Sequence, residues 1–367
     1  MESVMNCPAI TGIGLVTVLG RTADQTWEAL LAGRSIADHA PMPGFPGATR
    51  AIAMAQRAAA EALTRAGWTD ADCQKPDSAL FVGTSKGAIE AWMQFKTKTP
   101  DVHPGLRHGL SEIDFELARS FHFAGGPRLT ISSACSSGLH ALLRAAMAIE
   151  CGEARRALVV AVEASVHPLF ISSFKRLGVL APQGHGCRPF DFHRKGFVIS
   201  EAAAAVCLES SDHPVGRPMV RIDAWAVGGD GTHLTGGDPA GKALRNLLQR
   251  VARPGLDLIH AHATGTIVND PVELAAIETV AGPSRPILYS HKGALGHSLG
   301  AAGLVAAVLN CLCHSHGLVP PNVRSTRPLP IANLRFSADA IRQPINRSLA
   351  LAAGFGGPLA VVSFVNI

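Results

Sequence analysis

The sequence predicts an α/β protein made of two similar halves. Residues 129–162 read as a strand, a small-residue turn, a helix and a second strand, an order that implies a parallel sheet covered by helices. Residues 219–313 repeat this alternation of short apolar runs and longer helical patterns. Glycine and proline are spread along the 367 residues and mark no linker. We therefore expect two closely docked halves, 1–210 and 211–367.

The elements of the first half begin with a strand at 9–18. A helix with Asp24 as its N-cap should follow and end at Gly33. The other elements expected in this half are an alanine-rich helix at 51–66, a strand at 79–83, a helix at 111–123, a strand at 129–132, a helix at 139–149 and a strand at 158–162.

The second half contains strands that lead into polar turns. Two short strands, at 258–260 and 287–289, precede turns that carry His262 and His297. The remaining expected elements are a strand at 219–227, helices at 241–251, 272–280 and 299–313, and a closing hairpin of 349–353 with 360–365.

Composition excludes several function classes. The net charge is only +5 and the chain has one tyrosine and no long basic run, so nucleic-acid binding is a poor hypothesis. A mild basic excess still suits an acidic protein partner. The eight cysteines are not spaced as in a disulfide scaffold, which favours a reduced, cytoplasmic setting. We expect no signal peptide, and no stretch reaches the ~20 apolar residues of a membrane span.

Cys135 is the first candidate for chemistry. It lies among small residues, in Ser-Ala-Cys-Ser-Ser-Gly, where a strand gives way to a helix. The free N–H groups and dipole at a helix start favour a thiolate. A buried structural cysteine is an equally good interpretation of the turn on its own.

His262 follows an apolar strand in the segment His-Ala-Thr-Gly-Thr, with Asn269, Asp270 and Glu273 shortly after it. The carboxyl edge of such strands is where α/β sheets bind ligands. A histidine bonded only to local turn hydroxyls is the somewhat stronger interpretation when this turn is taken alone.

His297 lies in a glycine-rich segment that starts at Lys292 and has glycines at 296, 300 and 303. The glycines allow close helix packing and place His297 at the predicted start of a helix. The helix dipole there should lower the pKa of the histidine and keep it neutral, as a hydrogen-bond donor to an oxyanion. Lys292 can hold a neighbouring charge.

Taken together, the three turns resemble the signatures of β-ketoacyl-acyl-carrier-protein synthases of the type I/II group, which have a Cys-His-His triad. Other segments agree and extend the resemblance over nearly the whole chain: Ile10–Gly14, Arg188–Asp191, Gly196–Val198, Ser200–Ala202 and the glycine loop Gly354–Gly357. The resemblance implies a thiolase-like fold, with two similar βαβαβ-type halves in a layered α-β-α-β-α arrangement. It places the nucleophile in the first half and the histidines in the second.

The resemblance also implies roles for single residues. Cys135 is expected to be acylated, and His262 and His297 to bind the malonyl thioester and stabilise the enolate left by decarboxylation. Lys292 orders the site, and the backbone N–H groups of Cys135 and Phe355 form the oxyanion hole. Supporting positions are Thr264, Thr266, Asp270 and Glu273.

The activity that this resemblance implies is a decarboxylating Claisen condensation of an acyl thioester with malonyl-acyl-carrier-protein. No bound cofactor or metal is expected, because the substrates travel on the phosphopantetheine of the carrier. The implied partners are an acyl carrier protein and a second synthase-like subunit, in a homodimer or a heterodimer that pairs near strand 129–132.

Departures from the family pattern favour a specialised fatty-acid or polyketide-type pathway. The chain is short before residue 127 and between Glu163 and Arg188, and Ala306 stands where many members have a glutamate. Further departures are Ala263, Pro358 and the charged Lys86 in the turn Gly83–Gly87.

Two alternatives remain open. A thiolase-type acyltransferase would normally carry a second cysteine in the C-terminal glycine loop, which has none here. A chain-length-determining partner subunit would normally lack the nucleophile, whereas Cys135 and both histidines are present.

Two surface features complete the sequence-based predictions. Carrier docking is predicted at a basic stretch formed by Lys86, Lys96, Lys98 and Arg107. The run Cys311–His316 looks metal-like, but successive residues of a helix point in different directions, so a zinc site is not expected.

Overall fold

The computed structural model describes residues 7–47, 49–90, 109–212 and 214–367. Its strands are β1 Pro8–Thr17, β2 Ser78–Gly83, β3 Arg128–Ile131, β4 Arg156–Glu163, β5 Ala202–Ser210, β6 Val220–Gly229, β7 Leu258–His260, β8 Ile287–Tyr289, β9 Leu318–Val319, β10 Ile341–Arg342, β11 Arg347–Ala353 and β12 Pro358–Val365. Its α-helices are α1 Ala23–Leu31, α2 Arg50–Ala66, α3 Asp70–Cys73, α5 Glu112–Ser120, α6 Ser137–Glu150, α7 Pro168–Arg176, α8 Lys242–Val251, α9 Asn269–Ala281, α10 Lys292–Leu295 and α11 Ala302–His316.

Ten of these strands form one continuous sheet in the order β3-β2-β4-β5-β1-β6-β12-β11-β7-β8. Read from either end, the sheet begins with three strands that are parallel to one another, and each of the next two strands is antiparallel to the strand before it. Only two residue pairs, Ala9 with Arg221 and Ile10 with Val220, join the two groups of five. The two groups of five strands therefore repeat one pattern within this sheet, in agreement with the two similar halves of the predicted fold class.

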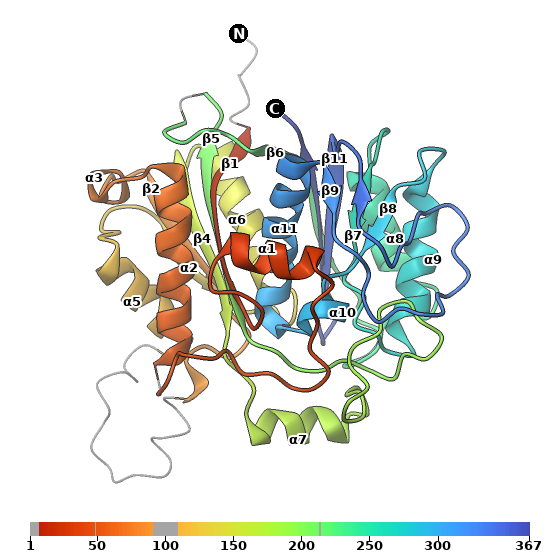
Figure 1. Ribbon diagram of the computed structural model, residues 1–367. Coiled ribbons are helices and arrows are strands. Elements are labelled where there is room, and N and C mark those ends of the chain that lie inside the picture. The colour runs from red at the N-terminus through yellow and green to blue at the C-terminus, as the bar shows by residue number, and fades with distance from the viewer. Residues whose placement is uncertain (1–6, 48, 91–108, 213) are drawn as a thin grey trace.

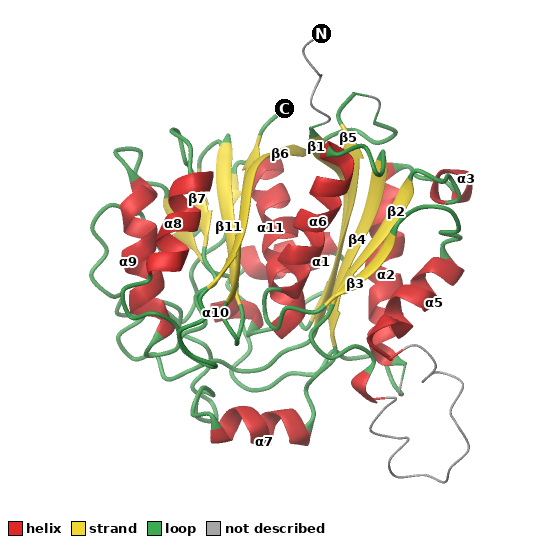
Figure 2. Ribbon diagram, turned by 180° about the vertical axis from the view of Figure 1, so that it is seen from behind, coloured by secondary structure: helices red, strands yellow, loops and turns green. Residues whose placement is uncertain are grey.

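The layers follow the predicted α-β-α-β-α arrangement. Helices α6 and α11 lie between the two groups of strands, with α2 and α5 outside one group and α8 and α9 outside the other (Figures 1 and 2). The segment Leu299–His316, which includes α11, is long and apolar enough to cross a membrane, but 89% of it is buried inside the protein. Burial between two sheets explains its apolar composition.

Helix α2 packs directly on the backbone of β1. A Cβ atom at Gly14 would lie 2.0 Å from the carbonyl oxygen of Ala58, and one at Gly12 would lie 2.2 Å from that of Ala62. The glycines and alanines therefore allow a helix–strand contact that larger side chains would prevent. Gly67 then ends α2 in the left-handed conformation.

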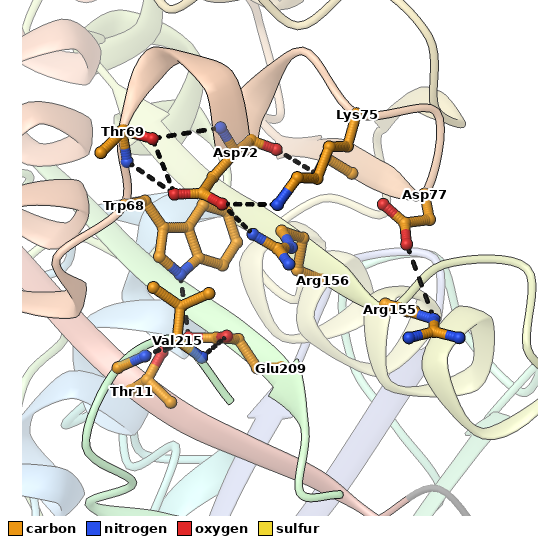
Figure 3. A network of polar contacts seen from close by, with 12 residues as sticks. Thr11, Trp68, Thr69, Asp72, Lys75, Asp77, Arg155, Arg156, Glu209 and Val215 are labelled. Atoms are coloured by element: carbon orange, nitrogen blue, oxygen red, sulfur yellow. Dashed lines mark hydrogen bonds and ion pairs between the residues drawn. The ribbon is translucent and has the colours of Figure 1, made fainter. Parts of the chain in front are cut away.

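Buried polar contacts fix the ends of β1 and β5 that are remote from the predicted catalytic turns (Figure 3). The Glu209 carboxylate accepts hydrogen bonds from Thr11 Oγ1 at 2.6 Å, Trp68 Nε1 at 2.8 Å and Val215 N at 2.6 Å. A fourth donor, the N–H of the next residue, also reaches this carboxylate. A buried carboxylate with this many donors is fully satisfied, so we assign it a structural role.

Most predicted elements are present, one N-cap is corrected, and the short elements α3, α10, β9 and β10 are additions to those expected. Thr22, not Asp24, is the N-cap of α1, since its side chain accepts from Gln25 N while Asp24 pairs with Arg65. Strand β5 and helix α7 were not predicted. Helix α7 has no buried residue, and in Figure 1 it lies apart from the other layers.

Candidate active site

Cys135 lies at the sharp turn that joins β3 to α6. Ala134 adopts a left-handed conformation with a φ of 49°, and the hydroxyl of Ser137 accepts from Ser133 N at 2.9 Å and donates to Ala134 O at 2.6 Å. Cys135 is 8% exposed, and the backbone N–H of Phe355 is near enough to its Sγ to act on the pKa of the thiol. The structure thus brings the predicted nucleophile against the C-terminal glycine loop.

The surroundings of Cys135 favour the neutral thiol, which corrects the expectation of a thiolate. Burial is the largest influence and raises the pKa of Cys135 to about 11, while Lys86, Lys292 and the Phe355 N–H act in the opposite direction. Desolvation therefore outweighs the helix dipole on which the expectation rested. Acylation at neutral pH requires a group that accepts the thiol proton.

The His262 turn is held by two carboxylates of α9. Glu273 accepts from the backbone N–H groups of His262 at 2.6 Å and Ala263 at 2.7 Å. Asp270 accepts from Gly265 N at 3.0 Å and from the N–H of Phe190 at 2.8 Å. Ala263 has a φ of 34°, so this backbone needs such support. Both acidic residues singled out from the sequence therefore fix the turn and do not face open solvent.

His297 lies beside His262. Their ring centroids are 5.4 Å apart, the planes are almost perpendicular, and the edge of the Phe197 ring packs on His297 with centroids 5.0 Å apart. Within the described residues, His297 Nδ1 is buried and has no hydrogen-bond partner. This nitrogen is therefore free to bond a bound molecule.

Both histidines have a pKa well below the ordinary value, because burial is the largest influence and Lys292 is positively charged nearby. The predicted neutral state of His297 agrees with this direction, but the predicted cause does not. His297 precedes a short 3-10 turn, Leu299–Ala301, and α11 begins only at Ala302. Desolvation, not a helix dipole, is the main reason.

Lys292 is 1% exposed, and its Nζ donates to the carbonyl oxygen of His262. Burial lowers its pKa, while the carboxylates of Glu273 and Asp270 act in the opposite direction. Ala306, where a glutamate was expected from the family pattern, is 2% exposed and offers no charge. Lys292 therefore links the His262 turn to the acidic pair on α9.

The two threonines predicted as supporting residues bond each other. Thr264 Oγ1 and Thr266 Oγ1 are 3.1 Å apart, and Thr266 Oγ1 also accepts from Asn269 N at 3.2 Å. Thr264 is 7% exposed and lies next to the acidic supports already described. Their hydroxyls shape the loop between His262 and α9.

Glu163 is a buried residue of this region that sequence reasoning gave no role. It ends β4, is fully buried, and accepts from Ser85 N at 3.0 Å and Gly300 N at 2.9 Å. It also accepts from the hydroxyl of Ser85. Its position as a single glutamate at the end of an apolar strand could have indicated this role from the sequence. Glu163 ties the turn after β2 to the segment after His297.

Only one of the four predicted docking residues can be placed. Lys96, Lys98 and Arg107 lie outside the described residues. Lys86 is half-buried, its ammonium donates to Ser85 Oγ at 2.7 Å, and it lies over the rings of Phe170 and Phe174. This ammonium faces these two rings beside the site more than it faces the outer surface.

Among residues 7–47, 49–90, 109–212 and 214–367, no group of three or more acidic, histidine or cysteine side chains is arranged to hold a metal ion. Cys311 and Cys313 are buried in the core, His314 bonds Ser348 Oγ at 2.9 Å, and His316 stacks on Trp27. These side chains of α11 do not converge.

Comparisons with known proteins assign both parts of the chain to the same family. Residues 47–213 match the family model of the β-ketoacyl synthase N-terminal domain, and residues 219–326 match that of the C-terminal domain. The solved structure of the ishigamide ketosynthase/chain length factor superimposes with a TM-score of 0.89 at 26% identity, over 99% of this chain and 100% of the other.

Two curated relatives are named as 3-oxoacyl or β-ketoacyl synthases, which are two names for one activity. The 3-oxoacyl-[acyl-carrier-protein] synthase 2 of Mycobacterium tuberculosis strain H37Rv is 34% identical over 64% of this chain, which spans 60% of that relative. The putative polyketide beta-ketoacyl synthase 1 of Streptomyces halstedii is 31% identical over 76% of this chain and 69% of its own length. With the site geometry and both domain models in agreement, the chain belongs to the β-ketoacyl synthase family.

Proposed function

We propose that this protein catalyses a decarboxylating Claisen condensation between an acyl group on Cys135 and a malonyl thioester carried by an acyl carrier protein. The observation that carries the proposal is that a buried cysteine packs in one cluster with Phe197, whose ring lies on His297, and that His262 and His297 are adjacent and neutral. Relatives named as acyl-carrier-protein synthases support the nature of the carrier.

In the first step, the Cys135 sulfur attacks the incoming thioester carbonyl. The thiol proton leaves to a base, and the carrier thiol is released, so an acyl-enzyme is formed. The Phe355 N–H lies near Cys135 Sγ, and with the N–H of Cys135 it can bind the oxygen that becomes negative. Donors that are preset in a dry site act more strongly than the same donors in water.

In the second step, loss of carbon dioxide from the malonyl group leaves an enolate. His262 and His297 are neutral, so each can donate one ring N–H to the enolate oxygen. The enolate carbon then attacks the acyl carbonyl, Cys135 leaves as the thiolate and recovers a proton, and the β-ketoacyl product stays on the carrier. Lys292 and Glu273 keep the His262 turn in place during both steps.

The alternative of a chain-length-determining partner receives support from one observation, the similarity to a ketosynthase/chain length factor structure. The complete set of Cys135, His262 and His297 favours catalysis. We propose a specialised fatty-acid or polyketide-type pathway, since a charged residue and an alanine replace the expected groups at Lys86 and Ala306. Carrier docking through Lys96, Lys98 and Arg107 stays a prediction.

The test combines acylation with decarboxylation. Intact-mass measurement should find an acyl group on the wild-type chain and none on Cys135→Ala. His297→Ala should lose roughly two orders of magnitude or more in malonyl decarboxylation, as expected for a lost oxyanion donor, and should keep most of its self-acylation. His316→Ala, at the exposed far end of α11, is the matched control and should be unaffected. Near-normal carbon dioxide release by His297→Ala would contradict the assigned role.

A further inference from the structure

Lys86 lies in a turn next to the one that carries Cys135. Strand β2 pairs in parallel with both β3 and β4, so the turns that follow these three strands meet at one sheet edge. Lys86 follows β2, Cys135 follows β3, and Glu163 ends β4. The cation is close enough to Cys135 and His297 to lower the pKa of each.

The ammonium of Lys86 stands against aromatic side chains that reach the site. Its Nζ is 5.1 Å from the ring centroid of Phe170 and 5.8 Å from that of Phe174. Phe174 in turn packs on Phe197 with centroids 5.8 Å apart and on Phe355 with centroids 6.1 Å apart. These four rings, Phe170, Phe174, Phe197 and Phe355, form what we call the aromatic wall. It runs from Lys86 to the groups that contact His297 and Cys135.

Most of the hydrogen-bonding capacity of Lys86 is unused. An ammonium has three donors, and Lys86 makes one hydrogen bond within the described residues, to Ser85 Oγ. Glu163 lies beyond that hydroxyl, but its Oε2 already accepts from Ser85 N and Gly300 N, and its Oε1 accepts from the hydroxyl of Ser165. Across the part of the chain that the structure describes, no carboxylate lies within ion-pair distance of Lys86. A half-buried cation with spare donors beside apolar rings suits an incoming oxygen.

The position of Lys86 relative to the histidines indicates which substrate it meets. His262 and His297 come from the second half, and they are assigned to the malonyl thioester. Lys86 and the aromatic wall residues Phe170 and Phe174 come from the first half, the half that also carries Cys135. Because Lys86 lies near Cys135 and against these rings, we assign it to the chain of the acyl group that Cys135 holds.

We propose that Lys86 is a specificity-determining residue that selects acyl groups carrying a carbonyl or carboxylate oxygen along the chain over saturated alkyl chains. The proposal rests on the proposed function. An alkyl chain along the aromatic wall would remove water from the ammonium and return no acceptor, whereas an oxygen would accept a charge-assisted hydrogen bond. Such a bond should favour the oxygenated acyl group by about tenfold to a hundredfold.

The experiment measures single-turnover acylation of Cys135 by intact mass, using pantetheine thioesters matched in length. One set contains hexanoyl, 5-oxohexanoyl and 5-carboxypentanoyl groups, and a shorter set contains butanoyl, acetoacetyl and succinyl groups. The wild-type enzyme should prefer an oxygenated member of at least one set by about tenfold or more. A preference for the carboxylate alone identifies an anionic acyl group, and a comparable rate with the ketone identifies a keto-acyl chain.

Lys86→Met should abolish this preference and keep or raise the rate with the alkyl thioester. Lys86→Arg should retain the preference, and Lys86→Gln provides a second neutral variant should the methionine variant unfold. Lys175→Met, which removes an exposed charge of α7, is the matched control and should leave the preference unchanged. Equal preferences in the wild type and Lys86→Met, or equal losses on all thioesters, would overturn the inference. Absence of acylation by every thioester would overturn the proposed function as well.

Discussion

The Cys135 thiol is neutral because it is buried, and this distinguishes it from Cys151. Cys151 is the exposed cysteine in the described part of the chain, whereas Cys135 has a pKa raised to about 11 by desolvation. Reaction with a small alkylating agent depends on both exposure and thiolate content. Reaction with an acyl thioester depends instead on the donors that surround the sulfur.

We therefore predict that two reagents label different cysteines. Iodoacetamide at neutral pH should modify Cys151 first, and modification of Cys135 should increase as the pH rises toward the pKa of its thiol. An acyl thioester or a cerulenin-like inhibitor that uses the site should modify Cys135. Peptide mapping after partial labelling distinguishes the two patterns. Acyl transfer to Cys151 in preference to Cys135 would contradict the assignment of the nucleophile.

Asp270 is a group near the histidines whose pKa lies close to neutral pH. Burial raises its pKa to about 7, whereas burial keeps His262 and His297 neutral throughout this range. The ionised carboxylate accepts from Gly265 N and Phe190 N, so protonation below its pKa turns one of these acceptor oxygens into a donor. The backbone of the His262 turn then loses a hydrogen bond.

The expected consequence is a malonyl decarboxylation rate that falls as the pH decreases through about 7, since the ionised form of Asp270 is the form that supports the turn. Asp270→Asn imitates the protonated carboxyl in having a single acceptor oxygen. The variant should be slower and independent of pH between about 6 and 8. Rates measured over this range decide the matter. A decline that persists unchanged in Asp270→Asn would assign the titration to another group.

At the level of elements, β5 shows how packing overrides local preference. Its sequence Ala-Ala-Ala-Ala-Val-Cys-Leu-Glu-Ser contains the best helix former four times in succession, yet it is a central strand between β4 and β1. Ala203 and Ala205 face α2, while Ala204 faces the central layer. Small side chains on both faces let helices approach the sheet closely, and that requirement comes from distant segments.

The same contrast explains which parts of the site could be predicted. The segments at Cys135, His262 and His297 have a local signature, a polar residue among small residues that follows an apolar strand within a few residues or, for His297, within a glycine-rich segment. Strand β5 and helix α7 have no such signature. The partners of Glu163 and Lys86 come from turns far along the chain, so only the assembled fold shows what these charges contact.

Enlarging a β5 alanine should therefore destabilise the fold. Ala205→Leu adds three carbon atoms between β5 and α2, where the alanine is fully buried. Overpacking of this kind costs about 1–3 kcal/mol. Ala275→Leu, at an exposed position of α9, is the matched control and should change the unfolding free energy by less than about 0.5 kcal/mol. Urea unfolding measures both. Similar midpoints for the two variants would show that α2 is less closely packed on β5.

At the scale of the whole molecule, the two edges of the ten-stranded sheet differ. The backbone of β8 is covered, because Leu288 N donates to Arg335 O at 2.9 Å and Arg335 N donates to Pro286 O at 3.0 Å. Strand β3, at the other edge, has no second strand partner within the described residues, and Leu129 is 42% exposed. An uncovered edge with an exposed apolar side chain is a place where another chain can pair.

We predict that β3 pairs with β3 of a second copy, or with the same strand of a related synthase-like subunit, about a two-fold axis. Pro127 O and Ile131 O point toward β2, as their hydrogen bonds to Leu80 N and Thr84 N show. Because backbone groups alternate in direction along a strand, the N–H and C=O of Thr130 must point outward. Thr130→Pro then removes a donor from the free edge and leaves the bonds to β2 intact.

Sedimentation should find the wild-type chain at twice its mass of 38.3 kDa, and Thr130→Pro should shift the population toward the monomer. Leu129→Lys should act in the same direction, since it places a charge on the apolar part of the edge. Arg335→Ala, at the edge that the chain already covers, is the matched control for a general loss of stability. If the chain alone is monomeric, addition of a related synthase-like subunit should produce the pair, because the edge still requires a partner. A stable and fully active monomer in the presence of such a subunit would contradict pairing through β3.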